Sequence, residues 1–414
     1  MRASLWTVMV GFAACAAVAS ADEKKPGASA KKPAIETTHE TIKEIVIKPE
    51  QGSGLQTICP GTDGQILALI SRPRYGPAPK GDVKCEVRSF DADGQPLAKW
   101  KIPFVAQSLN SGPGGTVFVA GDGRIARLGK DGSIAAEAAL PHLDKILADT
   151  ETLRKQAEEQ LKEQVKSFED MIKSMTEQKQ ALEKKSKDDP DSLTKAEKNQ
   201  LRALEMNLKA YEQAAKGYKN QTVDDVVKEL TSRLRIINAV AADEKYVYIA
   251  CGELKGYGYA VWRMDHDFQN PKQIGKGFSG CCGQMDIQCC NGEVLVAENS
   301  RHRVVRLDPD GKKLGTFGKA GRDGQAECFG GCCNPMNLRV NGQGVYTAES
   351  EGPVKLFTPT GDFVAAIGTV KISGGCKNVA ITVSADGGRV YFCDQPGGKI
   401  LVLAKKNGGG RSTE

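Results

Sequence analysis

Short runs of apolar, β-forming residues recur along most of the chain and define a repeated unit. The clearest copy extends from Met285 to Phe317 and contains four such runs. The last two runs are separated by Asp308-Pro309-Asp310-Gly311, a turn sequence whose glycine can adopt a positive φ. Four short strands in about 45 residues are typical of one blade of a β-propeller.

The unit can be counted six times. Further copies begin near Leu55, Ala106, Ile237, Met336 and Val379, and the last of them has only three strands. The run Thr41–Lys48 precedes the first copy and can pair with Lys399–Ala404 to complete the last blade. Closing the ring with both ends of the chain protects sheet edges that would otherwise aggregate. The sequence therefore predicts an all-β six-bladed β-propeller.

The pattern changes to helical spacing between Pro141 and Leu234. Apolar residues then follow three-four spacing in two seams, which predicts an inserted α-helical coiled-coil hairpin with a turn at Ser186–Ser192 and a short third helix at Thr222–Leu234. The seam residues are Val165, Phe168, Ile172, Met175 and Leu182 in the first arm, and Leu201, Leu204, Leu208, Tyr211 and Ala215 in the second. A self-contained spacer and a partner-binding arm both fit. We expect the hairpin to bind another protein.

The N-terminus resembles a signal peptide. Arg2 is followed by the apolar run Leu5–Val18 and by the small residues Ala19-Ser20-Ala21. We expect export to the periplasm or the extracellular space, with a lipoprotein attached at Cys15 as the alternative. No later segment is long and apolar enough for a transmembrane helix. The predicted organisation is a signal peptide (1–21), a disordered tether (22–40), blades 1 and 2 with the closing strand (41–140), the helical insertion (141–234), blades 3 to 6 (235–405) and a flexible tail (406–414).

One segment resembles a known repeat. Val296–Lys312 (VAENSRHRVVRLDPDGK) is similar to the NHL-repeat signature, in which an acidic residue follows a Val-Ala pair and a strand ends in Asp-x-Asp-Gly. The resemblance covers two blades well and the other four loosely. It implies the propeller fold but no single activity, because such propellers include both binding platforms and enzymes.

Cysteine pairs recur at equivalent places in the repeat. Gly280-Cys281-Cys282 and Gly331-Cys332-Cys333 occupy the same position in consecutive units, and Gly375-Cys376 occupies it one unit later. These positions lie where the outer strand of one blade crosses to the inner strand of the next, and such crossings surround the mouth of the central channel. We therefore expect these five cysteines to converge on one rim, with Cys328 close by in the same loop.

Three chemistries remain open for these cysteines. Disulfides could link adjacent crossings in an exported protein. Thiolates could instead hold zinc, copper(I) or an iron–sulfur cluster. A dithiol–disulfide redox site is the third. Because a bond within one Cys-Cys pair is strained, pairing between blades is favoured over pairing within a pair.

Composition excludes several functions. The net charge of +6 comes from 57 basic and 51 acidic residues, without a basic run interleaved with aromatic residues, so we expect no nucleic-acid partner. The four histidines form no zinc-enzyme motif, and the chain has no nucleophile elbow, phosphate loop or dinucleotide fingerprint. Gluconolactonase-type propellers hold a divalent cation through carboxylates and asparagine. The residues available here for that role are Glu298, Glu349 and Asp394.

The sequence favours a non-enzymatic function. In NHL-like repeats the acidic residue after the Val-Ala pair joins a strand to a loop, which argues against a gluconolactonase-like hydrolase. We expect an exported NHL-like binding platform with a cysteine-rich site at the channel mouth. The alternative is a periplasmic redox or metal- or iron–sulfur-binding protein that uses the Cys-Cys motifs.

Overall fold

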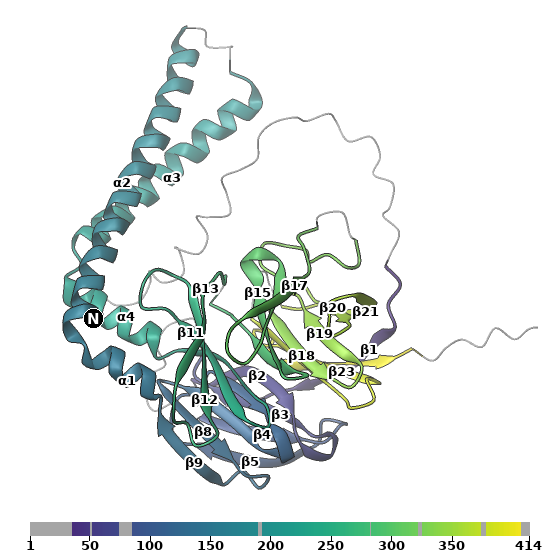
Figure 1. Cartoon of the computed structure of the whole chain (residues 1–414). Helices are drawn as coiled ribbons and strands as arrows, with labels where there is room; N and C mark the ends of the chain where they lie inside the picture. The colour runs from purple at the N-terminus through teal and green to yellow at the C-terminus, as the bar shows by residue number, and fades with distance from the viewer. Residues whose placement is uncertain are drawn as a thin grey trace, which may run out of the picture. The chain divides into compact units, whose positions relative to one another are not determined.

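The β-strands form six antiparallel four-stranded sheets that follow one another along the chain (Figure 1). The computed structural model describes residues 35–49, 52–73, 85–188, 193–281, 283–321, 325–373 and 378–406. The predicted signal peptide, most of the tether, the centre of the hairpin turn, Cys282, Cys376 and nearly all of the tail lie outside the described residues. Five of the sheets contain consecutive strands, ordered from inner to outer, and the sixth has its outer strand from the start of the chain.

The strand bounds give each blade. Blade 1 contains β2 (Gly54–Pro60), β3 (Ile66–Ser71), β4 (Cys85–Phe90) and β5 (Pro96–Ile102). Blade 2 contains β6 (Ser108–Ser111), β7 (Val117–Gly121), β8 (Arg124–Leu128) and β9 (Ile134–Ala139). Blade 3 contains β10 (Ile237–Ala242), β11 (Tyr246–Gly252), β12 (Tyr259–Asp265) and β13 (Lys272–Phe278). Blade 4 contains β14 (Ile287–Cys290), β15 (Glu293–Glu298), β16 (Arg303–Leu307) and β17 (Lys313–Phe317). Blade 5 contains β18 (Asn337–Asn341), β19 (Gly344–Ala348), β20 (Pro353–Phe357) and β21 (Phe363–Thr369). Blade 6 contains β22 (Val379–Val383), β23 (Arg389–Asp394), β24 (Lys399–Lys405) and β1 (His39–Val46).

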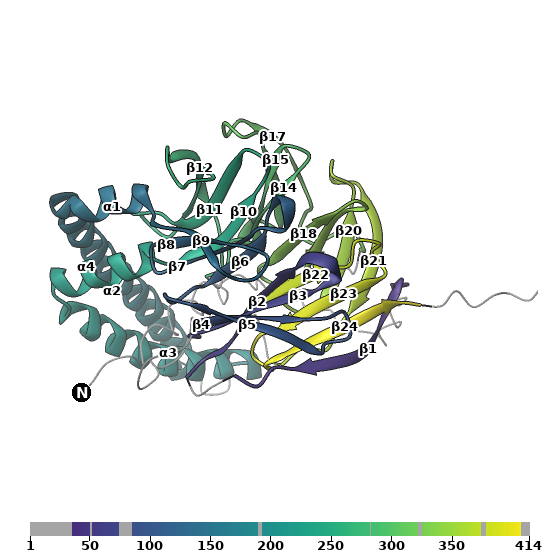
Figure 2. The ribbon, with the colours of Figure 1, turned by 90° about the horizontal axis from the view of Figure 1, so that it is seen from below.

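The ring closes through β1, as the sequence predicted. β1 pairs antiparallel with β24, from His39 opposite Lys405 to Val46 opposite Lys399, and so becomes the outer strand of the last blade (Figure 2). The strand begins two residues earlier and ends two residues earlier than the predicted run. The six-bladed propeller is therefore confirmed.

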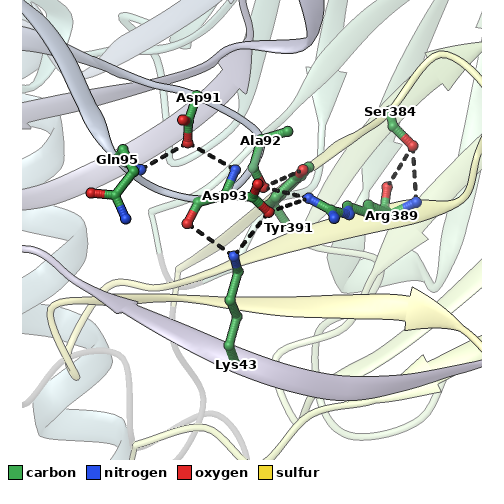
Figure 3. A network of polar contacts seen from close by, with 8 residues as sticks. All are labelled: Lys43, Asp91, Ala92, Asp93, Gln95, Ser384, Arg389 and Tyr391. Carbon is green, nitrogen blue, oxygen red and sulfur yellow. Dashed lines mark hydrogen bonds and ion pairs between the residues drawn. The ribbon is translucent and has the colours of Figure 1, made fainter.

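Polar contacts seal the junction between the last blade and the first. Asp93, in the turn between β4 and β5, accepts hydrogen bonds from Lys43 of β1 and Arg389 of β23 (Figure 3). Tyr391 of β23 donates to the carbonyl of Ala92 in the same turn. Beneath these contacts an apolar cluster contains residues of both blades, so the junction between the chain ends is packed like the other blade interfaces.

The inserted residues form a helical unit. By compactness the chain divides into one unit of residues 1–144, 234–253 and 257–414 and a second of residues 145–233 and 254–256. The helices are α1 (Pro141–Ala148), α2 (Thr150–Asp188), α3 (Lys195–Lys219) and α4 (Val223–Leu234). Within the described residues, none of the helices is long and apolar enough to cross a membrane.

The two long helices of this unit are antiparallel. Ion pairs join Lys185 to Glu197 near one end and Glu169 to Lys219 near the other. Between these pairs an apolar cluster forms around Met175, Leu204 and Leu208, all members of the predicted seams. Thr194 starts α3 through a capping box with Glu197, which satisfies backbone N–H groups at the start of the helix. A helical insertion is therefore present, as predicted.

Removing the insertion should leave the propeller folded. Gly123 accepts a hydrogen bond from Leu140 N and donates one to Arg235 O, so the chain leaves and re-enters the propeller beside the same residue. We expect a variant with Lys145–Arg233 replaced by a short Gly-Ser linker to keep its β-sheet circular dichroism and an unfolding midpoint, monitored by tryptophan fluorescence, within a few degrees of the parent. Trp100 and Trp262 both lie in propeller strands, so this signal reports the propeller. Loss of the cooperative transition would show that the helices belong to its core.

Candidate functional site at the crossing-loop face

All outer-to-inner connections emerge on one face of the propeller. The strands of each blade alternate in direction from the inner to the outer one, so every blade enters and leaves its sheet at the same end. We call this end the crossing-loop face. Among the described residues it comprises 47–49, 52–53, 103–107, 279–281, 283–286, 318–321, 325–336, 370–373 and 378. The root of the helical insertion and the described parts of the loops that follow the second strand of each blade also belong to it.

Glu298, Glu349 and Asp394 each hold a crossing loop in place. Glu298 ends β15 and accepts from Ser279 N at 3.1 Å, and Glu349, just after β19, accepts from Gly330 N at 2.7 Å. Asp394 ends β23 and accepts from the backbone N and the hydroxyl of Ser373. The three carboxylates thus make the same contact in three consecutive blades.

Basic side chains complete these contacts. Arg303 forms an ion pair with Glu298 at 2.5 Å, and the buried Lys355 forms one with Glu349. Lys355 also donates to the carbonyl of Cys328, which fixes the long loop 318–336 to blade 5. Glu298 and Glu349 thus already have cationic partners. The role of these carboxylates in holding a divalent cation remains a prediction.

The described rim cysteines occupy two neighbouring crossing loops. Cys281 lies in the loop before β14, and Cys332 and Cys333 lie in the loop before β18. Cys332 is exposed, Cys281 is partly buried and Cys333 is fully buried. Cys281 and Cys333 belong to the same apolar cluster, together with Met336. Cys282 and Cys376 lie outside the described residues, so the convergence of all five stays a prediction.

Asn299 connects the two cysteine loops. Its Oδ1 accepts from Cys281 N at 2.7 Å, and its Nδ2 donates to Gln284 O at 2.9 Å. The same Nδ2 lies 3.3 Å from Met336 Sδ in the next loop. His302 Nε2 makes a further contact of 3.1 Å with Gly331 O, beside Cys332. The buried asparagine side chain therefore holds the loops of blades 4 and 5 side by side.

The described residues alone do not form a thiolate metal site at this rim. Among them, no group of three or more His, Cys, Asp or Glu side chains is placed to hold a metal ion. Cys328 is buried, and its Sγ lies 3.1 Å from Gln325 Oε1 within its own loop. A thiolate site for zinc, copper or iron–sulfur would thus need Cys282 or Cys376, which leaves that prediction untested.

The other described cysteines lie in strands. Cys59, Cys85, Cys251, Cys290 and Cys393 are buried, and Cys289 is partly buried. Burial raises the pKa of Cys59 and of Cys251 to about 12. Such thiols stay protonated and are poor nucleophiles and poor metal ligands at neutral pH.

A hydrogen-bond network fills the central channel and ties all six inner strands together. Arg339 of β18 is buried and donates to Ile381 O, to Ile58 O and, at 2.5 Å, to Asn110 Oδ1. Asn110 of β6 in turn donates to Val240 O and Gln288 Oε1. In the order in which they are named, the six residues come from blades 5, 6, 1, 2, 3 and 4. The side chains of Arg339 and Asn110 therefore connect the whole ring.

The channel mouth above this network is polar and small. Asp286 Oδ2 accepts from Asn337 Nδ2 and from Leu338 N, both at 2.7 Å, and Gln284 hydrogen-bonds the backbone of Val379 across the channel. Burial raises the pKa of Asp286 to about 6, although the charge of Arg339 opposes the shift. The cavity between these side chains has a volume of about 40 Å³. That volume holds a few water molecules but not a metabolite.

Sequence reasoning missed this network. Asn110, Gln288 and Arg339 occupy the same position of their inner strands, as the register of each strand with its neighbour shows. The signal was available in the alignment of the repeats, because a large polar residue at a strand position next to core residues must find a partner.

A buried histidine anchors the root of the helical insertion to blade 3. His142, the second residue of α1, stacks on Trp262 with ring centroids 4.3 Å apart, and its Nε2 lies 3.9 Å from Cys251 Sγ. Burial lowers the pKa of His142 to about 4, from an ordinary 6.5. The folded protein therefore binds this proton less tightly than the unfolded chain, so the contribution of His142 to stability is complete above pH 6.5 and is lost as the pH falls towards 4.

Replacing His142 should make the free energy of unfolding less dependent on pH between pH 7 and pH 4. Between pH 7 and pH 4 the free energy of unfolding of the parent should fall by about 3 kcal/mol more than that of His142→Phe, which keeps a stacked ring but cannot be protonated. Urea titrations followed by tryptophan fluorescence at pH 7, 5.5 and 4.5 measure the difference. His302→Phe, in the loop after β15, is the control for replacing a histidine elsewhere in the propeller. Equal slopes for parent and His142→Phe would contradict the anchor.

The six sheets and their common crossing-loop face define the chain as a β-propeller. No protein-family model matches the sequence, and no curated protein matches it. Some solved structures do match it. Regucalcin, a calcium-binding protein from Agrobacterium tumefaciens, is similar with 10% identity, covering 90% of this chain and 96% of that one, with a TM-score of 0.45.

Two further structures are similar. A protein of unknown function from Bacteroides thetaiotaomicron has 10% identity, 90% and 76% coverage and a TM-score of 0.47. A protein described as a candidate gluconolactonase has 11% identity, 87% and 94% coverage and a TM-score of 0.44. All three TM-scores lie below 0.5, so these similarities carry no conclusion about this chain.

Proposed function

We propose that the protein is an exported, non-enzymatic binding scaffold of the NHL-repeat type, with the crossing-loop face as its working surface. The observation that carries this proposal is the filled channel. Arg339 and Asn110 join the six inner strands, and the cavity left at the mouth is about 40 Å³. Sites for small-molecule substrates are usually several hundred Å³ in volume. A ligand larger than a few water molecules must therefore bind on the crossing-loop face and not inside the channel.

The crossing-loop face is also where the chain departs from the plain repeat. It carries the long connection 318–336 with Cys328, Cys332 and Cys333, and the root of the helical insertion. Loops on a rigid scaffold commonly carry binding function, because they can vary without disturbing the core. The cysteine-rich rim and the inserted coiled-coil arm are, in this proposal, the parts that contact a partner protein.

Site-specific photo-cross-linking in living cells tests the proposal. A photoreactive amino acid is placed at the exposed Lys371 on the crossing-loop face, at Met206 on α3, or at the exposed Thr360. Lys371 and Thr360 follow and precede the same strand, β21, so they lie at opposite ends of one blade. We expect a discrete cross-linked species from Lys371 and from Met206, and none from Thr360.

The controls separate the parts of the proposal. A cross-link from Met206 alone would assign partner binding to the helical insertion. It would contradict the proposal that the crossing-loop face of the propeller contacts the partner. Cross-links from Thr360, or none at Lys371 and Met206, would overturn the scaffold as proposed. Cell fractionation of the same cells tests export, since the cross-linking pattern has to be found in the exported fraction.

Metal binding by the rim is the second candidate, because Cys281, Cys333 and Met336 share one apolar cluster. Soft sulfur ligands of this kind select copper(I) or zinc. Elemental analysis of protein purified without chelators decides it. A stoichiometric metal that is lost in Cys281→Ser would replace the scaffold proposal with a metal-handling one.

A further inference from the structure

Two sulfur atoms on the crossing-loop face lie in direct contact. Cys332 Sγ and Cys333 Sγ are 3.1 Å apart. A disulfide bond is about 2.05 Å long, so this distance is a non-bonded contact. Cys332 is exposed to solvent, whereas Cys333 is fully buried in the apolar cluster beneath the loop. The pair therefore combines one sulfur that a reagent can reach with a neighbouring sulfur that it cannot.

The loop that carries the pair is fixed on both sides. Asn334 is buried, and it accepts from Ser350 N at 2.8 Å and donates to Gly330 O at 2.7 Å. Gly330 N donates to the carboxylate of Glu349. These bonds hold Gly330 and Asn334, on either side of the pair, to each other and to the residues that follow β19. The backbone that carries Cys332 and Cys333 is therefore held in place around the sulfur contact.

A thiolate metal site and a dithiol–disulfide couple need different numbers of sulfur atoms. A tetrahedral thiolate site needs four ligands, with each sulfur about 2.3 Å from the metal. The described residues offer no group of three metal-binding side chains. Two adjacent sulfurs are enough for a two-electron dithiol–disulfide couple.

We propose that Cys332 and Cys333 form a reversible redox site that exchanges disulfides with low-molecular-weight thiols such as glutathione. The Cys332 thiolate attacks one sulfur of the oxidised thiol, whose S–S bond breaks and releases one thiolate. Cys333 then loses its proton, attacks Cys332 Sγ in the mixed disulfide and displaces the second thiolate. The protein gives up two electrons and two protons, and one oxidised thiol dimer becomes two reduced thiols.

Strain makes a disulfide between Cys332 and Cys333 easy to reduce, so its formation is reversible. Joining consecutive residues closes a ring of eight atoms, and strained or exposed disulfides are the ones that are most readily reduced. The buried strand cysteines differ, since burial holds the pKa of Cys59 and Cys251 near 12 and keeps them from forming thiolates. The site lies on the proposed working face, but the inference stands on the sulfur contact and needs no partner.

Peptide mapping of the full chain tests the proposal. The folded protein is equilibrated with glutathione buffers of increasing oxidised fraction, quenched with acid, unfolded, alkylated and digested with trypsin. One tryptic peptide, residues 323–339, carries Cys328, Cys332 and Cys333. In oxidising buffer we expect this peptide to lose two hydrogens and two of its three alkylation sites, with Cys328 still alkylated. Reduced glutathione should restore all three sites.

Single substitutions assign the sulfurs. Cys332→Ser, a change at an exposed position, should abolish the two-site loss, and the matched Cys328→Ser should retain it. Three results would overturn the proposal. The first is a bond between residues 323–339 and the peptide 277–301, which carries Cys281, Cys282, Cys289 and Cys290. The others are full alkylation of the parent at every glutathione ratio, or an unchanged two-site loss in Cys332→Ser. The cross-linking test of the scaffold uses other positions, so either proposal can fail alone.

Discussion

Replacing Arg339 with methionine should destabilise the propeller by about 3–5 kcal/mol, the largest effect we expect from a single substitution. The guanidinium bonds two backbone carbonyls and the side chain of Asn110, all buried in the channel. Methionine is unbranched and apolar, and it leaves these buried acceptors without their donors. The substitution also removes the positive charge that lowers the cost of ionising the buried Asp286.

Equilibrium unfolding in urea measures the loss, with tryptophan fluorescence as the propeller signal. Lys272→Met is the matched control, because Lys272 makes an exposed ion pair with Asp310 and such pairs contribute at most about 1 kcal/mol. Asn110→Ala should be intermediate. It leaves the guanidinium bonds to blades 6 and 1 in place and removes the bonds to blades 2, 3 and 4. An Arg339→Met protein as stable as Lys272→Met would show that the channel network is not what joins the blades.

The sequence predicted the propeller because each blade is a local unit. Strand periodicity, the Asp-x-Asp-Gly turns and the repeat length are readable within about 45 residues. Ring closure then follows from one missing strand, and β1 supplies it by pairing with β24. The antiparallel helices were predictable for the same reason, since seam residues such as Met175 and Leu208 lie close in sequence to the rest of their helices.

The network in the channel was not predictable in the same way. Arg339 and Asn110 are 229 positions apart, and only the closed ring brings them together. The cysteine loops show the same limit. Their equivalence was visible in the repeat, but the sulfur contact between Cys332 and Cys333 depends on how Asn334 fixes the loop. The carboxylates are a different case, because the resemblance to NHL repeats already implied that a residue such as Glu298 joins a strand to a loop, and Glu298 accepts from Ser279 N of the crossing loop.

Deleting β1 should open the ring and make the protein aggregate. Loss of residues 1–48 exposes the edge of β24 along its whole length, and an exposed edge pairs readily with other chains. It also uncovers the pocket filled by Ile45 and Ile47, each about 1.5–3 kcal/mol of burial. The contacts of Lys43 with Asp93 are lost as well. We expect a lower unfolding midpoint and light scattering at concentrations where the parent stays monomeric.

Truncation at two points separates the strand from the segment before it. A variant that lacks residues 1–36 keeps β1, including His39, whose Nε2 contacts Gly387 O at 2.9 Å in the last blade. It should unfold at the same urea concentration as the parent, whereas the variant that lacks 1–48 should not. A synthetic peptide of residues 37–49, added in excess, should bind the open edge and suppress the scattering, because it restores both the β24 pairing and the buried isoleucines. Stability unchanged by the longer truncation would mean that the five other blades and the three remaining strands of the sixth hold the ring without closure.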